Sequence, residues 1–189
     1  RVMSRVVAWI DTDALRRNVL RVRKLAPTAK ISAVVKANAY GHSVDIVINS
    51  ICDLVDGFSV ATLDEAIYIR DNLYSGELWV FSGVLSKDEA SVVKEKNLTP
   101  VVHSDYQISL LKAYSPTPSF IVKVDVGMGR LGFDAKSATK ILQDSKLKGH
   151  IRGVMSHFSH SDDTSSAITE SQLHRFLNLE NGGNFGKSI

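Results

Sequence analysis

The sequence predicts an α/β fold in which parallel strands and helices alternate to form most of a (β/α)8 barrel. Short apolar segments recur at intervals of roughly 20 to 32 residues, with amphipathic helical segments between them, which is typical of repeated βα units. Side chains suited to chemistry also follow several of these segments, as they do at a barrel mouth, where many strand ends converge. The predicted strands are residues 31–36, 57–60, 78–81, 99–103, 119–124 and 151–157.

The predicted helix starts alternate with the predicted strands. A first helix is expected before these strands, at "DALRRNVLRVRKL", with Asp11 or Thr12 as its cap. Four later starts carry a capping box, in which a Ser or Thr caps the helix and a Glu or Gln three residues later reaches back. Three of the four follow a predicted strand within a few residues, as a short βα loop requires. The pairs are Thr62 with Glu65, Ser86 with Glu89, Ser104 with Gln107, and Thr169 with Gln172.

An open, doubly wound sheet is the other common arrangement of βα repeats, and it should carry a Gly-rich nucleotide loop after its first strand. The sequence has "KANAYGH" there instead, which favours the barrel. Six of the eight strands of a barrel are visible. Beyond His157 come a polar loop, one helix and "NLENGGNFGKSI", which indicates neither a strand nor a closing helix. Residues 1–189 are therefore expected to form one incomplete barrel domain.

Composition narrows the class of protein. The net charge is only +3 and the basic residues are scattered, which argues against nucleic acid or a membrane surface as a partner. No apolar run approaches the ~18 residues of a membrane span, and no secretory signal is visible, so a soluble, cytoplasmic chain is expected. The single cysteine, Cys52, lies in an apolar run and is expected to be a small core residue.

Lys36 ends a strand of apolar and small residues, where an ammonium group needs a partner or a purpose. A solvent-exposed strand end is the simplest explanation. Near a barrel axis, however, desolvation favours the neutral, nucleophilic amine that Schiff-base chemistry requires. Tyr40 follows in a loop with Asn38 and Gly41, where a phenol could reach a phosphate at the same mouth.

Two further strand ends carry candidate residues. Arg130 lies among three glycines in "KVDVGMGRLGF" (123–133), where the backbone can approach a ligand closely, although a surface pair with Asp125 is the simpler explanation. His157 ends the strand 151–157, where a strand-end histidine bonded to a carbonyl would be unremarkable. His157 and His160 also stand before two aspartates, but this spacing is weak evidence for a metal site, and no metal is predicted.

The segment "VVKANAYGHS" (34–43) resembles the pyridoxal-phosphate attachment motif of the alanine racemases. The resemblance implies that Lys36 is catalytic and holds pyridoxal 5'-phosphate covalently, and that Tyr40 contacts the phosphate of this cofactor. Ser43 departs from the glycine that is usual in the family.

Two later segments, 123–133 and 153–163, resemble the same family in the same order. The resemblance implies that Arg130 lies near the cofactor's ring oxygen and that His157 packs against its ring. Lys123 takes a position that is often carbamylated in the family, where the acquired negative charge orients the arginine.

The opening "VVAWIDTDALRRNVLRVR" also resembles the family, in which Trp9 and Ile10 start a strand. The likeness extends to about residue 160. Complete family members continue into a C-terminal β domain, expected to be absent here, and take a second base, a tyrosine, from the partner subunit. The resemblance thus implies an isomerase that interconverts L-alanine and D-alanine for peptidoglycan, as a cytoplasmic homodimer in its full-length form.

Other functions stay open on the sequence alone. One is a non-catalytic, single-domain pyridoxal-phosphate-binding barrel, and another is a racemase acting on serine or another amino acid. A Schiff-base aldolase or a metal hydrolase on the same barrel is a third, because this fold hosts many chemistries. The last is an inactive truncation product, whose exposed strand edge and apolar sheet face would favour aggregation.

Overall fold

The computed structural model describes residues 6–179 and 186–188, which fall into two compact units. Unit 1 ends at Trp79 and unit 2 begins at Val80, so the boundary falls within the third strand. In both units the strands follow one another in chain order, and every strand pairing that is described is parallel.

Unit 1 opens with a helix that is capped as expected, because Asp11 accepts a hydrogen bond from the Ala14 N–H at 2.8 Å. This helix packs on α3, and Arg16 forms a two-pronged ion pair with Asp53 at 2.6 and 2.8 Å. Strands β1 and β2 pair from Ser32 opposite Gly57 onward. The elements are α1 (Thr12–Leu25), β1 (Ser32–Val34), α2 (Lys36–Tyr40), α3 (Val44–Ile51), β2 (Gly57–Val60), α4 (Leu63–Asn72) and β3 (Glu77–Val80).

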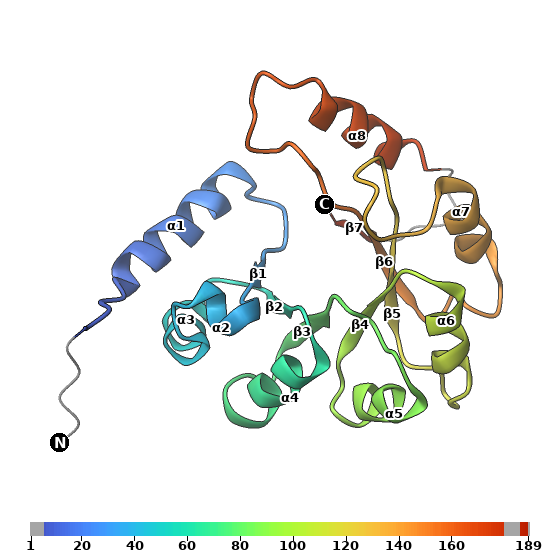
Figure 1. Cartoon of the computed structure of the whole chain (residues 1–189), viewed down its shortest axis with the longest axis horizontal. Helices are drawn as coiled ribbons and strands as arrows, with labels where there is room; N and C mark the ends of the chain where they lie inside the picture. Colours follow the sequence, from blue (N-terminus) through green and yellow to red (C-terminus); the bar gives the residue numbers. More distant parts are fainter. Residues whose placement is uncertain (1–5, 180–185, 189) are drawn as a thin grey trace. The chain divides into compact units, whose positions relative to one another are not determined.

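Unit 2 continues the alternation of helix and strand, with β5 between β4 and β6, and β6 also paired with β7. Helices α5, α6 and α7 lie along one side of these strands in Figure 1. The elements are α5 (Lys87–Glu95), β4 (Thr99–Val102), α6 (Asp105–Lys112), β5 (Phe120–Lys123), α7 (Ala135–Gln143), β6 (Ile151–Met155), α8 (Ile168–Leu177) and β7 (Gly186–Ser188).

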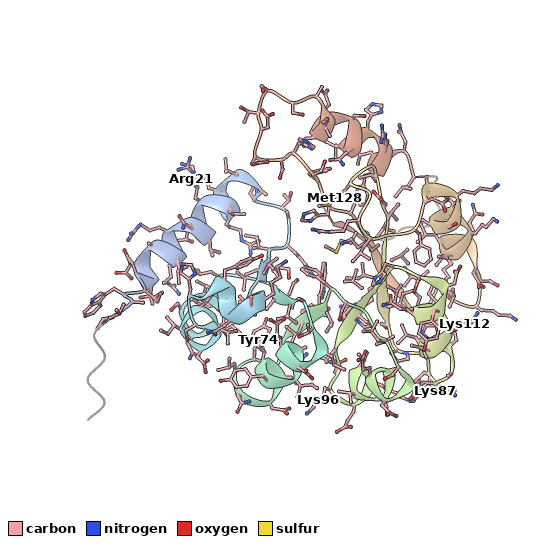
Figure 2. All side chains as sticks on the ribbon, viewed as in Figure 1. Arg21, Tyr74, Lys87, Lys96, Lys112 and Met128 are labelled. Carbon is pink, nitrogen blue, oxygen red and sulfur yellow. The ribbon has the colours of Figure 1, made fainter. Side chains whose placement is uncertain are left out.

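Three strands are buried on both faces, which explains why their sequences are largely apolar. Every residue of β2, β4 and β5 is buried. Phe58 anchors the core of unit 1 and packs edge-to-face on Tyr74, with 4.9 Å between ring centroids. Phe120 and Phe176 are fully buried in unit 2, whereas Lys87 and Lys112 are exposed on its helical side (Figure 2).

All six predicted strands are present, but several other expectations were wrong. Gly186–Ser188 forms a seventh strand paired with β6, in a segment that was expected to hold none. Trp9 is 91% exposed, and residues 6–11 form no strand. Cys52 is exposed rather than in the core. Thr169 does not cap α8, because this helix begins at Ile168 after Ala167. Residues 180–185 and 189 of the predicted irregular ending lie outside the described residues.

Two of the other capping boxes are only half formed. Ser86 and Ser104 cap their helices as predicted, but Glu89 and Gln107 reach one residue further back than a capping box requires. The box of Thr62 and Glu65 is complete. Within the described residues, no helix has the length and apolar character needed to cross a membrane.

Candidate functional site

Lys36 lies in a short turn after β1, not on the strand itself. β1 ends at Val34, and the chain then turns through four residues in the left-handed helical region, Ala37 to Tyr40, with φ between 52° and 54°. Left-handed backbone costs roughly 1–2 kcal/mol for each residue with a Cβ atom, and glycine is usually needed there. Such a conformation persists only where surrounding contacts impose it, and it is concentrated at functional sites.

Hydrogen bonds from three elements hold this turn, residues 36–41. The Val35 N–H donates to the Ser59 carbonyl of β2 at 2.9 Å, and the Ala37 N–H donates to Glu65 Oε1 of α4 at 2.6 Å. The Asn38 side chain accepts from the Val44 N–H at the start of α3, at 2.8 Å. The turn is therefore fixed by β2, α3 and α4 together.

The turn brings Lys36 and Tyr40 together. The Lys36 Nζ lies 5.8 Å from the centroid of the Tyr40 ring, within the range of a cation–π contact. Lys36 is half-buried and Tyr40 is 59% exposed. An amine and a phenol are thus presented side by side, with the phenol reaching solvent.

A cavity of about 390 Å³ borders the same turn in unit 1 and has a different chemistry. Its lining includes the carboxylates of Asp45, Asp64 and Glu65 but neither Lys36 nor Tyr40. The Tyr68 hydroxyl donates to Asp45 at 3.0 Å, and this bond raises the pKa of Tyr68. The gathered negative charge is unsuited to an anionic ligand such as a phosphate.

Lys123 is the last residue of β5 and is only 6% exposed. A buried lysine at a strand end is the kind of residue that functional sites hold, because lysine is seldom buried. Opposite it, β6 ends at Met155, and His157 follows two residues later, exposed to solvent. Ser156 ties the two strand ends together, since its hydroxyl donates to the Val124 carbonyl at 2.8 Å.

Arg130 is exposed on the loop between β5 and α7. Asp125 does not pair with it among the described residues, so the simpler surface-pair explanation was wrong. Asp125 Oδ1 accepts the N–H groups of Gly127 at 2.8 Å and Met128 at 2.9 Å, and its Oδ2 accepts that of Gly129 at 2.9 Å. Burial acts to raise the pKa of Asp125, but these N–H donors and the charge of Lys123 outweigh it and hold the pKa below its ordinary value.

His160 extends the loop after β6, and Ser159 lies 2.7 Å from its Nδ1. No group of three or more His, Cys, Asp or Glu side chains in the described part of the chain is arranged to hold a metal ion.

His103 is a candidate site residue that the sequence analysis missed. It directly follows β4, so its place at the end of "TPVVH" was the available signal. Burial lowers the pKa of His103, and the nearby charge of Lys123 lowers it further. Its Nδ1 is buried and has no hydrogen-bond partner among the described residues. His103 therefore favours the neutral imidazole beside the Lys123 strand end.

The five predicted site residues thus fall into two groups. Lys36 and Tyr40 meet in unit 1. Lys123 and His157 follow adjacent strands of unit 2, and Arg130 lies on the loop that leaves the Lys123 strand. Lys123 is the last residue of a strand, and the other four lie in segments that follow strands, which is the placement predicted for a site at strand ends.

Comparison with known proteins identifies the family to which the chain belongs. The family profile described as "Alanine racemase, N-terminal domain" matches residues 10–184. Alanine racemase of Pasteurella multocida (strain Pm70) is 38% identical over 192 residues, which cover 99% of this chain and 53% of that protein. The chain spans about half the length of the curated relatives it matches.

Solved structures give the same result for the fold. The biosynthetic alanine racemase from Pseudomonas aeruginosa superposes with a TM-score of 0.87 at 31% identity, covering 95% of this chain and 51% of that one. Alanine racemase from Bartonella henselae, whose structure holds covalently bound pyridoxal phosphate, gives a TM-score of 0.84 at 25% identity, covering 94% and 52%. The prediction of a partial (β/α)8 barrel is therefore confirmed, and the chain belongs to the family of alanine racemase N-terminal domains.

Proposed function

We propose that this chain is the N-terminal part, residues 1–189, of a pyridoxal-phosphate-dependent alanine racemase, an isomerase that interconverts L-alanine and D-alanine. The observation that carries the proposal is the strained turn that presents the amine of Lys36 beside the phenol of Tyr40. Strained, tightly held backbone at a strand end is typical of a site that must be preorganised. Membership of the racemase family supplies the substrate class.

The donor set of the chain fits pyridoxal 5'-phosphate. The cofactor offers an aldehyde, a phosphate and a pyridine ring. The Lys36 amine suits the aldehyde, and the Tyr40 hydroxyl suits a phosphate oxygen. In unit 2 we assign Arg130 to the ring oxygen and His157 to the ring face.

We assign Lys123 a supporting role. If it is carbamylated, it exchanges a buried positive charge for a negative one, which would pair with Arg130 and orient its guanidinium group. Its low exposure, 6%, at the end of β5 supports a role inside the site rather than at the surface.

When bound, pyridoxal phosphate withdraws electrons from the α-carbon of the amino acid, so that the α-proton becomes acidic. In one direction of the reaction Lys36 Nζ, as a free amine, would accept this proton on one face of the α-carbon, and in the reverse direction, as an ammonium group, it would donate a proton to that same face. Racemisation needs a second base on the opposite face, to which we assign no described residue of this chain. Two bases on opposite faces would explain how a racemase works in both directions.

The partners and location follow from the same proposal. The substrate is a small amino acid, and the product D-alanine supplies peptidoglycan. The full-length form acts as a homodimer in the cytoplasm, without nucleic acid or membrane as a partner. The small net charge of +3 supports this part of the proposal.

The proposal is tested by titrating the chain with pyridoxal phosphate and following visible absorption. We expect a new band in the wild type and in Lys112→Ala, which removes an exposed lysine at the end of α6, and no such band in Lys36→Ala. An equal band in Lys36→Ala would overturn the assignment of Lys36. The polypeptide made from the complete reading frame is then assayed for D-alanine; cofactor binding without D-alanine formation would favour a non-catalytic cofactor-binding barrel.

A further inference from the structure

We propose that Glu65 is the positioning residue for Lys36, and that its carboxylate holds the left-handed turn in which the lysine lies. The inference rests on the proposed function of Lys36. Glu65 lies on α4, in the βα unit that follows the one containing Lys36.

Glu65 connects two loops through one side chain. It is the third residue of α4, and its Oε2 accepts the N–H groups of Ala61 at 2.9 Å and Thr62 at 3.1 Å, which completes the capping box of its own helix. Its Oε1 reaches the preceding βα loop and accepts the Ala37 N–H at 2.6 Å. The hydrogen bond from the Ala37 N–H to Oε1 is therefore additional to the bonds of the capping box.

The bonded group on the turn is the peptide unit next to Lys36. The Ala37 N–H belongs to the peptide bond that joins Lys36 to Ala37, so the carboxylate fixes the plane of that bond. It does so at the first of four left-handed residues. The orientation of this plane determines the direction in which the chain leaves Lys36, and with it the approach of the Tyr40 ring to the Lys36 amine, 5.8 Å away.

The type of residue matches its partners. All three partners of Glu65 are N–H donors, and an ionised carboxylate accepts without donating. Gln107 stands at the same helical position in α6 and also connects two loops. There one partner is a donor, the His103 N–H at 2.9 Å, and the other is an acceptor, the Ser82 carbonyl at 2.7 Å. An amide suits that mixed pair, and a carboxylate suits Glu65.

The substitution Glu65→Gln tests the inference because it keeps the shape of the side chain and replaces one acceptor oxygen by a donor NH2 group. In either orientation of the glutamine amide, its NH2 group faces a backbone N–H of one of the two loops, so that two donors meet and no hydrogen bond forms there. Glu65→Asp is the second variant: it keeps the charge but is one methylene shorter, so it can cap α4 without reaching Ala37. Glu89→Gln is the matched control, since Glu89 holds the same place in α5 and its carboxylate accepts from the Leu85 N–H at 2.6 Å.

The first readout is hydrogen exchange of the Ala37 amide in the chain without cofactor, measured by NMR. Hydrogen bonds to charged groups are among the stronger ones in proteins, so we expect exchange at least about tenfold faster in Glu65→Gln and in Glu65→Asp. Glu89→Gln should leave the rate at Ala37 unchanged. Unchanged Ala37 exchange in both Glu65 variants would overturn the inference.

The second readout is the affinity for pyridoxal phosphate, which a purely structural role would not change once the variants are shown to be folded by circular dichroism. We expect a dissociation constant raised about tenfold in both Glu65 variants and unchanged in Glu89→Gln. Faster exchange at Ala37 with unchanged affinity would also overturn the inference. If the wild type fails to bind the cofactor at Lys36, the proposed function fails instead, and the exchange rate alone decides whether Glu65 holds the turn.

Discussion

Gly132 is the position at which a single added methyl group should most disturb the loop between β5 and α7, which carries Arg130. Its φ of +134° lies in a region that other residues rarely adopt. A Cβ atom there would lie 2.5 Å from the Asp125 nitrogen and 2.7 Å from the Val124 carbonyl carbon. Both are backbone atoms, and two backbone hydrogen bonds of 2.9 Å hold them in place. The Phe133 N–H donates to the Lys123 carbonyl, and the Phe133 carbonyl accepts from the Asp125 N–H.

Two costs act together in Gly132→Ala. Overpacking against a fixed backbone costs about 1–3 kcal/mol, and the unfavourable φ adds about 1–2 kcal/mol, so we expect a loss of about 2–5 kcal/mol in the free energy of unfolding. Gly129→Ala is the matched control. Its φ is +73°, but a Cβ atom there meets nothing within 4 Å, so only the backbone cost applies, about 1–2 kcal/mol.

The two variants are compared with the wild type by urea unfolding, followed by circular dichroism and by tryptophan fluorescence. We expect Gly132→Ala to lower the midpoint clearly more than Gly129→Ala, with similar slopes. Equal losses in the two variants would refute the reasoning, because the close approach of the backbone at Gly132 would then have no energetic consequence.

Three more predictions concern other parts of the structure. Asp125 has a pKa below its ordinary value of 3.8 in the folded chain, so its ionised form contributes stability above about pH 4 that is lost as the pH falls through the folded pKa. Asp125→Asn should therefore flatten the acid part of a plot of melting temperature against pH. An unchanged acid part of that plot would contradict the prediction. Cys52 is exposed, so a thiol reagent should modify it in the folded chain without denaturant. A thiol that reacts only after unfolding would mean that Cys52 is buried. Phe120 is fully buried, and Phe120→Ala should cost about 3–5 kcal/mol in urea unfolding; a loss below about 1 kcal/mol would mean that unit 2 has no tight core there.

Three of the six predicted strands could be predicted because they are buried on both faces. β2, β4 and β5 are largely apolar and buried at every residue, and such a sequence has few alternatives between two helices. β7 could not be predicted, because Gly186, Lys187 and Ser188 have no preference for a strand, and only their pairing with β6 makes them one. The strand expected at Trp9 fails for the converse reason: an apolar sequence forms no strand without a neighbour to pair with.

The proximity of Lys36 and Tyr40 could be predicted from the sequence, but the backbone that presents them could not. Lys36 and Tyr40 stood out because their chemistry was unusual for a strand end. The left-handed turn between them was invisible, since among Ala37, Asn38 and Ala39 only asparagine favours that conformation. In the turn, the Ala37 N–H donates to Glu65, 28 residues away in sequence, whose pattern predicted only a helix cap.

The exposure of Cys52 has a similar cause. Its apolar neighbours predicted a buried residue, but Cys52 directly follows the end of α3 and is exposed, although Ile51 before it and Val55 after it are buried. Local sequence gives the periodicity of a helix more reliably than the residue at which it ends.

The central claim is that Lys36 carries pyridoxal phosphate, and the most direct measurement is to treat the chain with the cofactor, fix it with borohydride and map the modified peptide by mass spectrometry. The account predicts a pyridoxyl group on Lys36, with the other lysines unmodified at stoichiometric cofactor. Modification spread over the exposed lysines, or concentrated at Lys123 with Lys36 unmodified, would contradict it.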